Sequence, residues 1–522
     1  MHFQKMIENP DLKNLTLIGF FLLCSYLLLY WQDPPLMLVF LFGSFFIYLF
    51  SQLLYWILNI SSWREISIIF LSQLFIVALV FPRINSLELW GDEIGVIELS
   101  ESPFETISHL VAISHASVPP FDYWIMHLWG GIVGRFDVYY QEFLYRIPYL
   151  FYHILATIFF FLILKHESLY LKLKESLTIK KIILITTSLG YFVHPLLFLY
   201  AVEVRFYSLA ILGVVVTLYL FLTKRLQTTS AIIISGIFCL NSIFQFIIIF
   251  PLLVVSLIEK KFRKQAFFAL IFHLILLKII WPRLNMYLPI SGNESIALIQ
   301  SSFSNFVANL FVSSLQLTIF SIVVAVYIFK IKRKKHQFLI SLTGVCLFVI
   351  AFSSYHKGYF DFHLRHFIFT LPIILFLLLS FPLRISHRFP RILILGFMVV
   401  FTVPWFISTW YSLGGQNSFS KSLVGAKQIV SKAKRENKTL MVFPISKIHD
   451  SYLEGVYSFN ARTLFWYAKR YKIEISNEKL SSISCEEITS SIIVVRFWDA
   501  IDCLEKEQIE KEVIFDSNVY TL

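Results

Sequence analysis

Long apolar runs, separated by short polar or basic stretches, dominate the chain from about residue 15 almost to residue 411. A helix that crosses the hydrocarbon core of a bilayer needs about 20 predominantly apolar residues, and runs of that length recur throughout this part. The strands of a membrane β-barrel would instead alternate apolar and polar residues, so the pattern predicts helices. Counting the runs gives about thirteen membrane spans. The shortest pair, 229–241 and 243–258, fits either two half-length helices or one bent helix.

The pattern changes after Tyr411, where the stretch Leu413-Gly414-Gly415-Gln416-Asn417-Ser418 has the composition of a linker. Beyond it, helical and strand-like segments alternate, which favours a small α/β domain. The sequence therefore predicts an all-α polytopic membrane domain over 1–411 and a soluble α/β domain over 412–522. The segments expected in the second domain are helices at Ser420–Asn437, Asn460–Tyr471 and Asp502–Lys511, and strands at Thr439–Ile445, Lys472–Ser476, Ser491–Phe497 and Glu512–Phe515.

Composition and charge agree with a membrane protein and set its orientation. Hydrophobic residues make up 57% of the chain and charged residues only 15%, well below the quarter or so of soluble domains. The net charge of +12 comes from basic clusters in short loops, which marks those loops as cytoplasmic and argues against nucleic acid as a partner. The intervening loops, including a long first one at 82–140, then lie outside. An odd number of spans places 412–522 outside as well, and an even number places it inside.

The two cysteines of the second domain, Cys485 and Cys503, leave two readings open. In an extracytoplasmic domain they could form a disulfide, and otherwise they are two unpaired thiols. Neither a C-x-x-C pair nor the spacing of a zinc finger occurs, so we expect no structural zinc site.

The first outer loop carries the strongest candidate chemistry. Trp90-Gly91-Asp92-Glu93 follows a membrane span, and a short surface helix is expected from Glu93, with a second one from Ser102. Neighbours on a helix point about 100° apart, so only one of the two carboxylates can face a given pocket. Asp92 fits two roles, a proton acceptor or the N-cap of the helix. Glu93 is then its supporting neighbour.

Further polar residues are expected at the same outer membrane level. Each of these residues alone could be one whose long side chain reaches from the membrane edge to water. Cations beside carboxylates at the same depth of the membrane, however, favour a functional site. They are Arg205 and Tyr207 after one span, Lys357, His363 and Arg365 before another, and His115, Asp122 and Glu203 in the outer loops.

At these residues the chain resembles the GT-C membrane glycosyltransferases, and within them the protein O-mannosyltransferases and the lipid A aminoarabinose transferases. The resemblance covers about 82 to 411 and lies in the order of short landmarks on one face. These are Trp90-Gly91-Asp92-Glu93, the run from Pro119-Pro120 to Trp129, Arg146-Ile147-Pro148, Glu203-Val204-Arg205-Phe206-Tyr207, and Arg365-His366-Phe367 with Leu371-Pro372.

The resemblance implies an inverting transfer from a polyprenyl-phosphate-linked sugar to a lipid, protein or polysaccharide acceptor outside the cell membrane. Asp92 would take a proton from the acceptor, with Glu93 beside it. Phosphate is a good leaving group that needs fixed cations, and arginine suits that task. Donor binding would use Arg205 and Arg365, then Lys357 and His363, with Tyr207, Asp122 and His115 as further contacts.

Two departures from the family pattern concern the donor. Val118 stands before the proline pair, where relatives often carry Lys or His, so either His115 replaces that residue or the phosphate is held elsewhere. Asp122 is also atypical, and two readings fit it: an acceptor of a hydrogen bond from a sugar hydroxyl, or a solvated interfacial residue. We expect no required cofactor. Some branches of the family bind a divalent metal near the loop of Glu203, which makes Glu203 the candidate ligand here.

Two other kinds of membrane protein share some of these features. A transporter or lipid flippase would place charges near mid-membrane and show related halves, whereas the charges here lie at the outer edge. An O-antigen ligase or polymerase also uses polyprenyl-linked sugars, but would rest on outer-loop arginines and histidines without the Asp-Glu landmark.

Overall fold

The computed structural model describes part of the chain. The described residues are 19–23, 47, 51–57, 63–89, 91–101, 121–136, 138–170, 177–226, 228–242, 244–258, 263–284, 314–329, 344, 368–380, 391–412, 425–443, 463–477, 492–497, 510–514 and 517–521. The expected second surface helix from Ser102, together with Cys485 and Cys503, lies outside them.

The chain divides into two compact units. The bundle unit comprises Met1–Leu79, Pro103–Ile125 and Pro148–Thr409, and the tail unit comprises Val80–Ser102, Met126–Ile147 and Trp410–Leu522. The tail unit thus combines the residues after the linker with parts of the first outer loop. The division into 1–411 and 412–522 stays a prediction.

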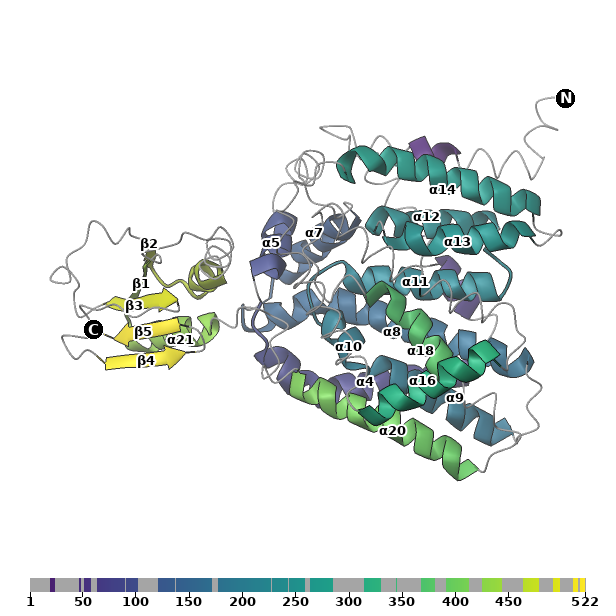
Figure 1. Ribbon diagram of the computed structural model, residues 1–522. Helices are drawn as coiled ribbons and strands as arrows, with labels where there is room; N and C mark the ends of the chain where they lie inside the picture. Colours follow the sequence, from purple (N-terminus) through teal and green to yellow (C-terminus); the bar gives the residue numbers. More distant parts are fainter. Residues whose placement is uncertain are drawn as a thin grey trace, which may run out of the picture. The chain divides into compact units, whose positions relative to one another are not determined.

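Helices make up the described part of the bundle unit (Figure 1). Several helices have one end in each unit: α4 (Trp63–Ser86), α7 (Phe121–Val133), α8 (Val138–Tyr170) and α20 (Arg391–Ser412). The others are α9 (Leu177–Phe192), α10 (Pro195–Ala201), α11 (Tyr207–Leu222), α12 (Thr229–Asn241), α13 (Phe244–Ile258), α14 (Arg263–Leu284), α16 (Ser314–Phe329), the 3₁₀ turn η3 (Ile368–Thr370) and α18 (Leu371–Leu379).

Within the described residues, two helical stretches are long and apolar enough to cross a membrane. They are Trp63–Ile84, with 22 residues, and Tyr140–Glu167, with 28. A third span results if Lys181–Phe192 and Pro195–Ala201, which are bent by 62°, count as one. Pro195 opens α10 and His194 before it is extended, as proline requires of its predecessor. The expected number of thirteen spans is not confirmed and stays a prediction.

Helix α11 forms the core of the bundle unit. It is apolar all round, and every one of its residues is buried, as expected for a helix enclosed by others. It packs against α10, α12, α13 and α18. At Gly213 a Cβ atom would come within 2.7 Å of both Gln245 Nε2 and Phe238 Cγ, so this contact needs glycine.

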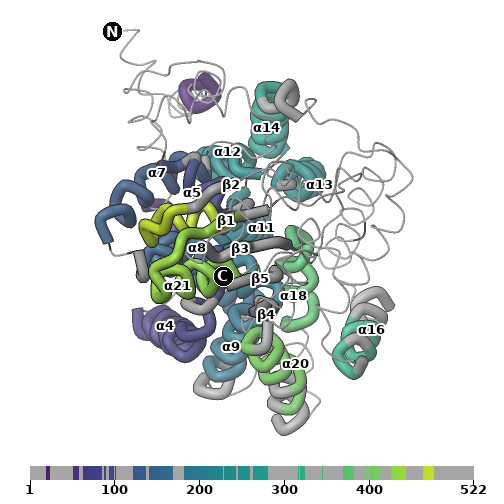
Figure 2. Tube along the Cα trace, turned by 90° about the vertical axis from the view of Figure 1, so that its left-hand side faces the viewer, coloured from purple at the N-terminus to yellow at the C-terminus, as the bar shows by residue number. Residues whose placement is uncertain are grey.

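Helices α12 and α13 are two half-length helices that pack against each other and against α14 (Figures 1 and 2). The chain turns between them at Ser242, whose backbone is extended at φ −159°. Of the two arrangements that the sequence left open for this region, the structure has the pair of separate helices rather than one bent helix.

The tail domain, the part of the tail unit after the linker, contains a five-stranded mixed sheet in the order β2-β1-β3-β5-β4. Parallel pairing joins β1 (Thr439–Phe443) to β2 (Ile475–Asn477) and to β3 (Ile492–Phe497), and antiparallel pairing joins β5 (Ser517–Thr521) to β3 and to β4 (Glu510–Ile514). Helix α21 (Ala426–Glu436) packs against β1 (Figure 1). It buries Ala426, Ile429, Val430 and Ala433, the spacing of one helical face.

The α/β character expected for this domain is confirmed, with one segment wrong. The expected helix at Asp502–Lys511 is contradicted at Glu510 and Lys511, which belong to strand β4, and β5 was not expected. Pairing of β4 with β5, in register from Glu510 with Thr521 to Ile514 with Ser517, outweighs the helix propensity of a Glu- and Lys-rich segment. The other two expected helices of this domain are present, one as α21 and one at 463–471.

Candidate functional site

Helix α5 (Gly91–Glu101) carries the Asp-Glu pair of the first outer loop. The helix begins at Gly91, so Asp92 is its second residue rather than the residue before it. A carboxylate in the first turn is favoured by the partial positive charge of a helix N-terminus. The side chain of Asp92 lies outside the described part of the structure, and its role as proton acceptor stays a prediction.

Glu93, the next residue, is buried and faces a cation. Its side-chain Oε2 lies 3.9 Å from Nη2 of Arg146 on α8, and both side chains are at most 3% exposed. The ion pair belongs to the internal structure of the tail unit. The catalytic support expected of Glu93 stays a prediction.

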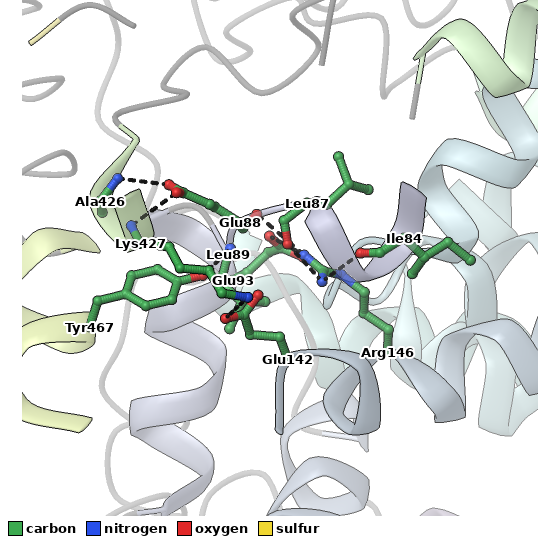
Figure 3. A network of polar contacts seen from close by, with 10 residues as sticks. All are labelled: Ile84, Leu87, Glu88, Leu89, Glu93, Glu142, Arg146, Ala426, Lys427 and Tyr467. Carbon is green, nitrogen blue, oxygen red and sulfur yellow. Dashed lines mark hydrogen bonds and ion pairs between the residues drawn. The ribbon is translucent and has the colours of Figure 1, made fainter. Parts of the chain in front are cut away.

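Arg146 binds the backbone of the segment from Ile84 to Glu88, which leads into α5 (Figure 3). Its guanidinium donates hydrogen bonds to the carbonyl oxygens of Ile84 at 3.5 Å, Leu87 at 3.1 Å and Glu88 at 3.2 Å. A buried arginine needs such partners, because a buried charge without them is costly. Sequence reasoning used Arg146 only as a landmark. The signal for a structural role was an ionisable residue inside an apolar run.

The same stretch contacts the tail domain through Glu88 (Figure 3). Both carboxylate oxygens of Glu88 accept hydrogen bonds from backbone amides at the start of α21, Ala426 and Lys427, each at 2.9 Å. Lys427 Nζ in turn lies 3.1 Å from Oε1 of Glu142 on α8. Burial raises the pKa of Glu88 to about 7, and Glu142 also raises it, while Lys427 and the two amides oppose this rise.

In the bundle unit, a second candidate carboxylate is Asp122, near the start of α7. It is 2% exposed, and the Tyr149 hydroxyl of α8 donates a hydrogen bond to its Oδ2 at 3.0 Å. Its Oδ1 is buried and has no hydrogen-bond partner among the described residues. Burial raises the pKa of Asp122 to about 7, against the opposing effects of the Tyr149 hydrogen bond and the charge of Arg205.

Arg205 and Tyr207 lie in this unit too, at the turn between α10 and α11. The Arg205 guanidinium carbon is 5.5 Å from the centroid of the Tyr207 ring, a cation–π distance. Tyr207 is buried and makes an edge contact with Tyr200. Of the residues predicted to bind donor, the structure therefore brings Asp122 within the electrostatic influence of Arg205 and sets Arg205 against Tyr207.

The remaining predicted site residues are not brought together by the described structure. Lys357, His363, Arg365 and His115 lie outside the described residues. Glu203 is half-buried in the turn before α11. Within the part of the chain that the structure describes, no group of three or more His, Cys, Asp or Glu side chains could hold a metal ion. Metal binding at Glu203 stays a prediction.

Helix α7 includes two consecutive glycines near its end. The helix continues through Gly130 and Gly131 to Val133 and ends at a turn in which the Gly134 amide donates a hydrogen bond to the Gly130 carbonyl oxygen at 2.8 Å. The following helix, α8, passes through Pro148 and carries Arg146 and Tyr149.

Comparison with known proteins rests on the fold, because no family model and no curated protein sequence matches the chain. A solved structure that it matches is that of ArnT from Cupriavidus metallidurans bound to undecaprenyl phosphate, with 11% sequence identity and a TM-score of 0.50. The match covers 88% of this chain and 98% of ArnT. The chain has the fold of ArnT.

ArnT is a GT-C lipid A aminoarabinose transferase, so the resemblance predicted from the sequence is confirmed at the level of the fold. The fold is that of an integral membrane protein. At 11% identity the match with ArnT is evidence about architecture, and the roles of individual residues do not follow from it.

Proposed function

We propose that the protein is a membrane glycosyltransferase that moves a sugar from a polyprenyl-phosphate donor to an acceptor. The observation that carries this proposal is the match to ArnT over nearly its whole length, in a structure that contains undecaprenyl phosphate. The order of the GT-C landmarks along the sequence supports it independently. The finer parts of the proposal are about thirteen spans, as estimated from run lengths, and a reaction at the extracytoplasmic face, where the tail domain also lies.

In the proposed reaction, Asp92 accepts the proton of an acceptor hydroxyl or amine. The freed lone pair forms a bond to the anomeric carbon of the sugar from the side opposite the phosphate. The bond between that carbon and the phosphate oxygen breaks, and its electron pair leaves with the polyprenyl phosphate. The configuration at the anomeric carbon is therefore inverted. Positioned proton transfer of this kind typically contributes about 10²–10⁴-fold to a rate.

Cations would stabilise the charge on the leaving phosphate. Arg205 is held against Tyr207 in the bundle unit and is suited to this contact, because a guanidinium offers two parallel hydrogen bonds to phosphate oxygens. Arg365, Lys357, His363 and His115 are the further donor-binding residues of the proposal.

Asp122 would contact the sugar. Its Oδ2 is engaged by Tyr149, and its Oδ1 is the buried acceptor that a donor hydroxyl would satisfy. Leaving such an acceptor unpaired costs about 1–3 kcal/mol, so an occupied site would recover part of that cost. This is also how a site discriminates against a sugar that lacks the hydroxyl.

The chemistry needs no cofactor, and a divalent metal at Glu203 is not part of the proposal. The acceptor would be a lipid, a protein or a polysaccharide. A flippase would move the intact lipid-linked sugar, and a ligase would transfer a longer glycan from a polyprenyl carrier.

The test uses the full-length protein in lipid, with polyprenyl-phosphate sugars that carry a label in the sugar and with membrane extract as the source of acceptor. We expect label to move to acceptor in the wild type and transfer to fall at least about 10²-fold in Asp92→Asn. The matched control is Glu98→Gln, which removes a carboxylate from the same helix and should keep wild-type transfer. Full transfer by a folded Asp92→Asn protein would refute the role of Asp92.

A further inference from the structure

The tail domain contacts the chain just before α5, the helix that carries Asp92, and the last residue of that helix. At the first end, the carboxylate of Glu88 caps α21 from a position 338 residues away along the chain. Glu88 is two residues before Trp90, so this contact fixes the chain just before α5 begins. Helix α21 has Gly425 at its N-terminus with no side-chain cap of its own, and the Glu88 oxygens satisfy its first two amides.

Two neighbouring contacts close this end (Figure 3). The Leu89 amide donates a hydrogen bond to the hydroxyl of Tyr467, at 3.0 Å. Both residues are fully buried. Lys427 uses two groups in these contacts. Its backbone amide donates a hydrogen bond to the Glu88 carboxylate, and its side-chain Nζ lies 3.1 Å from Oε1 of Glu142, which links α21 to α8. Arg146 holds the backbone carbonyl of Glu88 from the other side.

The far end of α5 is held by the same domain. Arg470, three residues after Tyr467 on the helix at 463–471, pairs with the carboxylate of Glu101, the last residue of α5. The same guanidinium donates to the side-chain oxygen of Gln141 on α8. The Tyr145 hydroxyl donates a further hydrogen bond to Glu101 at 2.6 Å. Glu101 is therefore bonded to the tail domain and to α8 together.

The charges on the two sides are complementary. The acids Glu88, Glu101 and Glu142 come from the loop and from α8, whereas Lys427, Arg470 and the α21 N-terminus come from the tail domain. The contacts involve two separate helices of the tail domain and residues on both sides of α5. A single contact could be incidental, but contacts on Glu88 and Leu89 just before this 11-residue helix, together with contacts on its last residue, restrain its position and its direction.

We propose that the tail domain is a clamp that positions α5, with Glu88, Lys427 and Arg470 as the positioning residues. This inference rests on the proposed function for its consequence, because α5 carries the residue assigned as the base. A displacement of about 1 Å in a catalytic group can cost about 10²-fold in rate. Opening of the clamp would therefore lower turnover without removing any group that touches substrate.

The clamp can be tested by hydrogen exchange of the full-length protein in lipid, independently of any substrate. The variants are Glu88→Ala, which removes the cap, and the pair Lys427→Gln and Arg470→Gln, which opens the clamp if Glu88→Ala fails to fold. Matched controls are Arg435→Gln, an exposed cation of α21, and Glu436→Gln, an acid of the same helix whose partner is Lys438 within the tail domain.

We expect the clamp variants to raise exchange about tenfold in the first turn of α21 and in Gly91–Glu101, and the controls to leave both segments at wild-type rates. Faster exchange in α21 with unchanged exchange in α5 would overturn the proposal, and so would unchanged exchange in both.

Transfer kinetics give a second readout. The clamp variants should lower kcat by about tenfold or more and change KM less than twofold, because donor-binding groups are untouched. Looser α5 with wild-type kcat would overturn the positioning role. If the wild type transfers no sugar from any donor, the proposed function fails, while hydrogen exchange still decides whether the tail domain restrains α5.

Discussion

Replacing Arg146 by methionine should destabilise the tail unit strongly. The side chain is 1% exposed, so methionine fills most of the same space without replacing any of its polar contacts. Three carbonyl oxygens, those of Ile84, Leu87 and Glu88, lose a charged donor, and Glu93 loses the cation 3.9 Å away.

The size of the effect follows from these contacts. Removing one partner of a buried ion pair typically costs about 3–5 kcal/mol, because the other charge stays buried without compensation. The three hydrogen bonds share one guanidinium and are not additive with the ion pair, so the total stays in the same range. We expect the Arg146→Met protein to lose about 3–5 kcal/mol of unfolding free energy.

A double-mutant cycle tests this expectation. Steric trapping in bicelles would measure the unfolding free energy of wild type, Arg146→Met, Glu93→Gln and the double variant. The double variant should be more stable than Arg146→Met alone, since the charge left behind has been removed. Arg135→Met is the matched control, because Arg135 is exposed in the same unit, and it should change stability by less than about 0.5 kcal/mol. An Arg146→Met protein within about 1 kcal/mol of wild type would refute the structural role of Arg146.

Three further predictions concern other contacts. Because burial raises the pKa of Glu88 to about 7 from an ordinary 4.5, its contribution to the free energy of unfolding is complete below pH 4.5 and is lost as pH rises through 7. The free energy of unfolding of the wild type should therefore fall relative to that of Glu88→Gln between pH 4.5 and pH 7, and a constant difference between the two proteins would contradict this shift. Tyr149→Phe removes a hydrogen bond that lowers the pKa of Asp122, so donor binding, if it needs the ionised carboxylate, should weaken at a higher pH than in the wild type, and an unchanged pH dependence of KM would contradict a sugar contact by the ionised Asp122. Gly213→Ala places a Cβ 2.7 Å from two side-chain atoms and should cost about 1–3 kcal/mol in unfolding free energy, whereas Gly131→Ala, with nothing within 4 Å, should cost nothing.

The membrane class and the ArnT-like fold could be predicted because both depend on patterns that the sequence shows directly. Apolar run length indicates membrane helices, and the order of Asp92, the proline pair, Arg205 and Arg365 resembles the order of the GT-C landmarks. In the tail domain, the segment Thr439–Ile445 was predicted to be a strand, and its parallel pairing with β3 is known only from the structure. The start of β4 was wrongly assigned to a helix, because Glu510 and Lys511 favour a helix when they are considered alone, and only pairing with β5 explains their extended conformation.

Contacts between distant parts of the chain could not be predicted. Nothing in the sequence relates Glu88 to Ala426, or Glu101 to Arg470, which is 369 residues further along the chain. These contacts depend on how the tail domain and the first outer loop fold into one unit. Asp122 was predicted to contact sugar from its unusual place in the proline-pair segment, and its hydrogen bond to Tyr149 emerged only from the structure.

The proposed function requires that the protein break the bond between a sugar and a polyprenyl phosphate. Mass spectrometry of the reconstituted wild-type protein, incubated with a polyprenyl-phosphate sugar and acceptor extract, measures this step itself. We expect one equivalent of free polyprenyl phosphate for each sugar transferred, with the anomeric configuration inverted. Recovery of the intact donor, whether unbound or moved across the bilayer, would contradict the proposed function.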